Sequence, residues 1–119
     1  MIFPKPGGPV RGSKTGRPVM ALLDLLGRRM CLRILWELQE ATLRFRPLQE
    51  AAETNPNVLN TRLGELREAG LVALAPDGYQ LTSAGRDLAA LLLPLNRWAD
   101  DWADDWAEGW AETLPPPPS

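Results

Sequence analysis

The sequence predicts a mainly α-helical protein with one small β-hairpin and an extended C-terminal helix. Leucines recur at helical spacing along most of the chain, as in Leu59, Leu63 and Leu66. Gly70 follows this stripe as a left-handed helix end, and two short apolar runs then flank the turn residues 75–78. A short helix, a tight turn, a second helix and a hairpin, in that order, make up a winged helix-turn-helix, which lays a helix against nucleic acid.

Composition narrows the class of protein. The 119 residues suffice for one ordinary core, and a single cysteine excludes an intramolecular disulfide framework. No stretch reaches the roughly 20 apolar residues of a membrane helix and no signal peptide is apparent, so we expect a cytoplasmic protein without membrane contact. The chain has no histidine and no glycine-rich phosphate loop. We therefore expect no catalytic residues, no metal site, no cofactor and no enzymatic activity.

The charges are distributed unevenly along the chain. Residues 1–97 carry all 13 lysines and arginines and nine acids, whereas residues 98–119 carry six acids and no base. Because charges are screened within ~10 Å, these local fields matter more than the net charge of −2. The basic body is compatible with a polyanionic partner, and the acidic end should not face that partner.

The first elements are an arm and two helices. Residues 1–16, rich in glycine and proline, predict a flexible basic arm. A first helix is expected over residues 18–27, and it should end at Gly27, because glycine ends a helix at little energetic cost. A second helix is expected over residues 28–40. The residues expected to point inward from these two helices are Leu22, Leu23, Leu25, Leu26, Cys31, Ile34, Leu35 and Leu38.

The helix-turn-helix follows. A third helix is expected over residues 47–53, with proline tolerated in its first turn. Residues 54–57 form the turn, and Asn57 is a credible N-cap for the fourth helix, over residues 58–69.

The hairpin and the last helix complete the domain at residues 17–97. Strands are expected at residues 71–74 and 79–81, and Thr82 or Ser83 should cap the last helix. Pro94 should kink that helix because it removes a backbone donor. The apolar stripe of this helix is Leu88, Leu91, Leu92 and Leu95.

The outward face of the fourth helix is the expected DNA-reading surface, because the N-terminal side chains of such a helix enter the major groove. Asn60, Thr61 and Arg62 should read bases. Gly64 costs ~1 kcal/mol of stability relative to alanine in a helix interior. Close approach of a backbone or a phosphate is one explanation for this glycine, and simple tolerance is the other. The alternative function is a protein–protein adaptor on the same fold. The expected DNA-binding residues are Arg44, Arg46, Asn57, Asn60, Thr61, Arg62 and Arg67.

Several motifs together resemble the HxlR-type family of bacterial and archaeal transcription regulators over about residues 17–99. The matching positions are Gly27-Arg28, Ile34-Leu35, Leu38, Arg44-Phe45, Leu48, Leu59, Leu63, Leu66, Gly70-Leu71, Tyr79, Leu81-Thr82, Gly85 and Trp98. The resemblance implies a winged helix-turn-helix regulator that binds double-stranded DNA and forms homodimers through terminal helices. We expect a repressor that competes for promoter DNA.

Two positions depart from the family pattern. Arg17 stands where the family often has a cysteine, which rules out thiol sensing at that position. The wing is shortened to residues 75–78 and carries Asp77, which argues against insertion into a minor groove; the basic arm could compensate. Cys31, on a buried stripe, is interpreted as a packing residue rather than a redox sensor.

A tryptophan repeat occupies residues 98–113, followed by a proline-rich tail at 114–119. Tryptophans recur every fourth residue and sweep ~120° of a helix, with acids on the opposite side. The leading interpretation is a seam between subunits; the alternatives are a cage for a small aromatic or cationic effector, an acidic segment that inhibits DNA binding, and a mere repeat expansion. The expected dimer interface is Leu22, Leu26, Leu92, Leu95, Trp98, Trp102, Trp106 and Trp110.

Overall fold

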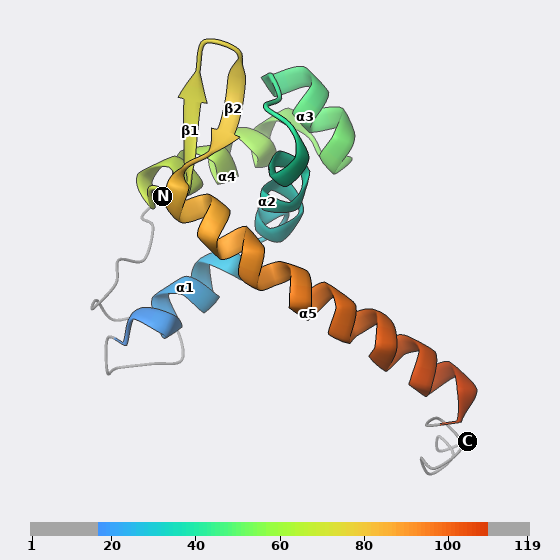
Figure 1. The fold of residues 1–119 in the computed structure, drawn as a ribbon. Helices are drawn as coiled ribbons and strands as arrows, with labels where there is room; N and C mark the ends of the chain where they lie inside the picture. The colour runs from blue at the N-terminus through green and yellow to red at the C-terminus, as the bar shows by residue number, and fades with distance from the viewer. Residues whose placement is uncertain (1–16, 110–119) are drawn as a thin grey trace, which may run out of the picture. The chain divides into compact units, whose positions relative to one another are not determined.

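The computed structural model describes residues 17–109 and confirms the predicted mainly α-helical fold with one hairpin (Figure 1). Residues 1–16, predicted to form a flexible arm, lie outside the described residues, as do Trp110 and the proline-rich tail. The chain divides after Ala89 into two units. The elements are α1 (Pro18–Leu26), α2 (Cys31–Glu40), α3 (Phe45–Ala52), α4 (Pro56–Glu68), β1 (Val72–Ala75), β2 (Gly78–Leu81) and α5 (Ser83–Glu108).

One aliphatic core holds the first unit together. The predicted inward stripes of α2 and α4 are buried, and Leu48 of α3 joins them. Burying a leucine or isoleucine side chain contributes about 1.5–3 kcal/mol, so this cluster supplies much of the stability. The cluster consists of Leu25, Cys31, Ile34, Leu35, Leu38, Leu48, Leu59, Leu63, Leu66, Val72, Leu81 and Ala89.

The inward face of α1 differs from the prediction at one position. Ala21 and Leu25 are buried, whereas Leu23 is 55% exposed. Because Ala21 and Leu25 are four residues apart, they share one face, and Leu23 lies about 200° around the helix from each. Leu22 and Leu26 are half-buried on the edges of that face.

Helix starts also differ from the prediction. α2 begins at Cys31 rather than Arg28, because Met30 has a left-handed φ of +71° that cannot continue a helix. α3 begins at Phe45, two residues earlier than predicted, which leaves Pro47 still inside the first turn.

The cap of α4 is Asn55, and the prediction of Asn57 is wrong. The Asn55 Oδ1 accepts a hydrogen bond from the Val58 N–H at 2.9 Å, and Pro56 occupies the first helical position. Proline suits that position because its missing N–H would have no helical partner there. The cap lies two residues earlier, so Asn57 is inside the first turn, with an exposed side chain.

The hairpin is anchored to the segment before α3. β1 and β2 are antiparallel, with Ala75 paired to Gly78 across the two-residue turn. Tyr79 and Leu43 exchange backbone hydrogen bonds of 2.7 and 3.0 Å. Gly78 has a φ of +136°, and a Cβ there would lie 2.6 Å from the Leu43 carbonyl. Only glycine permits this approach, which fixes the wing against the helix-turn-helix.

α5 starts at a threonine cap. The Thr82 Oγ1 accepts from the Gly85 N–H at 3.1 Å and donates to the carbonyl oxygen of Gly70 at 2.6 Å. Gly70 itself has a φ of +79°, which confirms the predicted left-handed end of α4. α5 is continuous through Pro94, so the expected kink does not interrupt it. None of the helices described could span a membrane.

Candidate nucleic-acid interface

The outer face of α4 is polar and open. Asn57, Asn60 and Gly64 are exposed and Thr61 is half-buried, while the leucines of the opposite face are 0–1% exposed. Side chains three and four residues apart share a helix face, so these polar residues form one row along α4. The structure thus brings Asn57, Asn60 and Thr61 together, as predicted. A shallow hollow of about 400 Å³ lies along this row, lined by Asn60, Thr61, Gly64, Glu65 and Glu68.

Arg62 is not free on that face. Its guanidinium pairs with Glu65, and its Nε donates to the carbonyl oxygen of Arg29 at 2.9 Å. Only 14% of the Arg62 side chain is exposed. A base contact by Arg62, as the sequence suggested, would first require breaking these internal contacts. In the structure, Arg62 instead connects α4 to the turn before α2 through Glu65 and the Arg29 carbonyl oxygen.

A buried carboxylate organises this support. Glu65 is 4% exposed and pairs with both Arg62 and Arg28, and Arg28 also pairs with Asp24 of α1 at 3.2 Å. A carboxylate inside a core is costly unless it is paired, so these arginines are required partners. The network joins α1, the turn before α2, and α4. Sequence reasoning missed it, although Glu65 falls between the inward residues Leu63 and Leu66.

Cys31 lies near the same arginines. Burial raises the pKa of its thiol, and the positive charges of Arg62 and Arg28 lower it to a smaller extent. The thiol is therefore held in its protonated form, which is unreactive. Its position, with no exposed surface, supports the packing interpretation.

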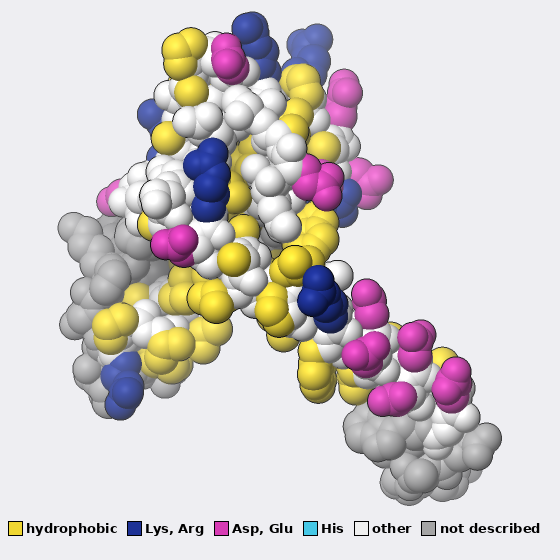
Figure 2. All heavy atoms as spheres, in the orientation of Figure 1, with side chains coloured by type: hydrophobic (Ala, Val, Ile, Leu, Met, Phe, Trp, Pro, Cys, Tyr) yellow, Lys and Arg dark blue, Asp and Glu magenta, His cyan; other side chains and the backbone are white. Residues whose placement is uncertain are grey.

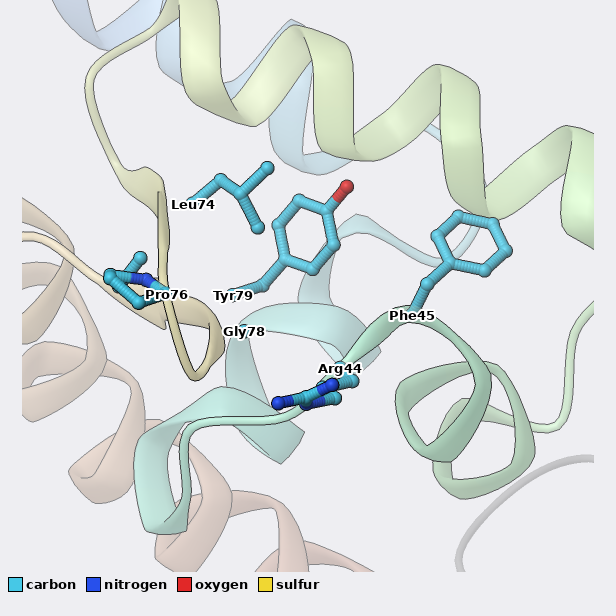
Figure 3. A pocket seen from close by; sticks show the side chains of 7 residues that line it. Arg44, Phe45, Leu74, Pro76, Gly78 and Tyr79 are labelled. Atoms are coloured by element: carbon cyan, nitrogen blue, oxygen red, sulfur yellow. The ribbon is translucent and has the colours of Figure 1, made fainter.

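Arg44 and Arg46 flank the start of α3. Both are exposed, and neither forms an ion pair within residues 17–109. Arg44 borders a hollow of about 260 Å³ between α3 and the hairpin, where the Phe45 and Tyr79 rings come from α3 and β2 (Figure 3). A guanidinium beside apolar walls and unpaired helix-start N–H groups suits a phosphate and its sugar. Arg67, near the end of α4, is also exposed.

Apolar side chains are exposed on α1. Val19 and Leu23 are 51% and 55% exposed, four residues apart on one face. Leu22 and Leu26, which the sequence suggested for a dimer interface, are half-buried, and Leu26 packs against the core. Among residues 17–109, the apolar face of α1 that packs against nothing is therefore that of Val19 and Leu23.

The part of α5 that belongs to the second unit, from Ala90 onward, carries a separate apolar stripe. Trp98 and Trp102 stack with ring centroids 5.9 Å apart and planes 10° from parallel. Figure 2 shows acidic side chains along one side of this part of α5 and apolar side chains on the other. Leu92 is half-buried. The exposed members of the stripe are Leu91, Leu95, Trp98, Trp102 and Trp106.

Several known proteins are similar to this chain in sequence or in fold. Two uncharacterised HTH-type transcriptional regulators, from Mycobacterium bovis and Mycobacterium tuberculosis, are each 36% identical over 93 residues, with 72% of this chain and 59% of each relative covered. The chain thus spans about 59% of the length of these relatives. The quinone-bound YodB from Bacillus subtilis superposes with a TM-score of 0.65 at 28% identity, over 70% of this chain and 96% of YodB.

A family model agrees with these relatives. The model of the HxlR-like helix-turn-helix matches residues 25–107, from the end of α1 almost to the end of α5. The family comprises DNA-binding transcription regulators and not enzymes, in agreement with the sequence prediction. The match includes the polar row of α4, the hairpin and the exposed leucine–tryptophan stripe of α5. The chain belongs to the HxlR-like helix-turn-helix family.

Proposed function

We propose that this protein is a homodimeric repressor that binds specific DNA sequences with α4 in the major groove. The observation that carries the proposal is the polar row of α4, exposed opposite a fully buried leucine face. A helix held in this way presents short hydrogen-bonding groups to base edges without disturbing the core. Bound over a promoter, the protein would exclude the transcription machinery.

The DNA-contacting residues divide by chemistry. Asn57, Asn60 and Thr61 read base edges, since asparagine can pair bidentately with adenine. Arg44, Arg46 and Arg67 contact phosphates and set affinity. We now assign Arg62 to positioning α4, because its guanidinium is held by Glu65 and by the carbonyl oxygen of Arg29.

A second copy of the chain is the proposed partner of the apolar faces. The exposed side chains of α1 and the leucine–tryptophan stripe of α5 are large apolar surfaces of the kind that oligomer interfaces bury. A two-fold dimer would place two α4 helices on half-sites about one helical turn apart.

A small aromatic or cationic effector is also proposed. YodB was crystallised with a quinone, which shows that a protein of similar fold accepts a flat ring compound. As the alternative to the subunit seam, the stacked and exposed rings of Trp98 and Trp102 are the chemically suitable surface for such a compound.

A gel-shift series with genomic fragments tests DNA binding. We expect selective shifts that weaken with salt, with a slope near −0.9 per neutralised phosphate in log–log form. Arg44→Ala should reduce that slope by about one phosphate and leave sequence preference unchanged. Asn60→Ala should relax preference at one position. Absence of binding at low salt would leave the protein–protein adaptor as the function.

A further inference from the structure

Gly64 lies at the centre of the DNA-facing row, and the described fold gives no reason for a glycine there. A Cβ added at Gly64 would meet no atom of the described residues within 4 Å, and the backbone there is not left-handed. Glycine in a helix interior is destabilising relative to alanine. Within residues 17–109, neither packing nor backbone conformation compensates for this loss of helix stability. The missing side chain therefore indicates a requirement of a bound partner.

The chemistry around Gly64 restricts what that partner presents. The hollow above it is bordered by Asn60, Thr61 and Glu68, with Glu65 beneath. The Glu65 carboxylate is engaged by Arg28 and Arg62, whereas Glu68 is exposed and forms no ion pair within residues 17–109. A free carboxylate repels a phosphate and accepts hydrogen bonds from amines. The hollow is thus suited to a neutral donor rather than to the DNA backbone.

We propose that the hollow over Gly64 receives a base edge that carries an exocyclic amino group, with Glu68 as its acceptor. In the major groove these groups are the N6 amine of adenine and the N4 amine of cytosine. The absent side chain at Gly64 lets α4 approach the base closely enough for this bond. The inference rests on the proposed function and makes Gly64 and Glu68 specificity-determining residues.

The first test measures stability and DNA affinity together on the full chain. A preferred duplex is selected from a random DNA pool with the wild-type protein. Gly64→Ala should raise the melting temperature by about 4 °C, because alanine favours the helix. The same variant should bind the selected duplex about 5- to 150-fold more weakly, the range expected for loss of one good base contact. Gly109→Ala, where a Cβ also meets no described atom, is the matched control and should bind like wild type.

The second test removes the amine from the DNA. Each adenine of the selected site is replaced in turn by purine, and each cytosine by 2-pyrimidinone, which lack the exocyclic amino group. At least one replacement should weaken wild-type binding about 5- to 150-fold, and the replacement whose loss is not added to that of Glu68→Ala identifies the amine as that of adenine or of cytosine. Glu68→Ala should weaken binding to normal DNA by the same factor. On the duplex that lacks the amine, Glu68→Ala should bind no more weakly than wild type, because both changes remove the same hydrogen bond.

The outcomes separate this inference from the function on which it rests. Wild-type selection of a duplex, together with undiminished binding by Gly64→Ala, overturns the inference and leaves DNA binding intact. Losses that add to that of Glu68→Ala at every replaced base also overturn it. Failure of the wild-type chain to select any duplex overturns the proposed function and the inference with it.

Discussion

Glu65 is a carboxylate placed among leucines, and its two arginine partners come from different parts of the fold. Arg62 lies one turn earlier on α4, and Arg28 lies in the turn between α1 and α2. The Arg62 Nε also holds the Arg29 carbonyl, in the turn that ends with left-handed Met30. These contacts orient α4 relative to the rest of the first unit. The polar row of α4 is therefore supported by charge pairing as well as by leucine packing.

Removing the Glu65 carboxylate should be strongly destabilising. Glu65→Ala leaves the Arg62 side chain, which is 14% exposed, without its carboxylate partner, whereas Arg28 keeps its pair with Asp24. Breaking a buried pair in this way costs about 3–5 kcal/mol. Urea denaturation measures the loss. Glu68→Ala, an exposed acid on the same helix, is the control and should change stability by less than about 0.5 kcal/mol. Equal stability of the two variants would show that the network contributes nothing.

At the scale of elements, the short wing and the start of α4 decide how the proposed DNA-binding surface is presented. The hairpin is held to the strand-like segment before α3 by the Leu43–Tyr79 bridge, and its two-residue turn carries Asp77. An acid at the tip of the wing disfavours a phosphate contact there. The start of α4 depends on Asn55, so the geometry of the helix-turn-helix is sensitive to this cap.

Loss of the α4 cap should be measurable against a neighbouring asparagine. Asn55→Ala removes the acceptor of the Val58 N–H and should cost ~1 kcal/mol. Asn57→Ala, on the same first turn but without a capping bond, should be within about 0.5 kcal/mol of wild type. Thermal unfolding of the two variants gives the comparison. If Asn57→Ala lost more stability than Asn55→Ala, the cap would be Asn57, as expected from the sequence.

At the scale of the whole molecule, the proposed dimer depends on the exposed tryptophans of α5. Truncation after Arg97 removes the tryptophan repeat. Each large side chain lost from an interface removes about 1.5–3 kcal/mol of burial free energy that would stabilise the dimer. We expect sedimentation at matched concentrations to show a shift from dimer to monomer.

Two controls separate the roles of the repeat. Truncation after Gly109 keeps Trp98, Trp102 and Trp106, and should largely preserve the dimer. Replacement of Asp100, Asp101, Asp104 and Asp105 by asparagine keeps every tryptophan and removes four charges, so it tests inhibition by the acidic segment. Tighter specific DNA binding by a protein that stays dimeric after truncation at Arg97 would support the inhibitory interpretation and contradict the seam.

The sequence alone determined the order of the helices, the hairpin and the buried leucine stripes, because helical spacing and turn residues are local signals. It also determined the polar row of α4, since that row is what remains when Leu59, Leu63 and Leu66 point inward. The family could be identified from motif order for the same reason.

Only the tertiary structure decided which side chains are occupied by distant partners. Arg62 meets the Arg29 carbonyl, and Glu65 meets Arg28, across more than 30 residues of sequence, which no local pattern encodes. The exposed face of α1 depended in the same way on how the chain packs. A side chain is free to bind a partner only where the fold leaves its polar groups unpaired. That is why the helix could be predicted from sequence, whereas the residues available on it could not.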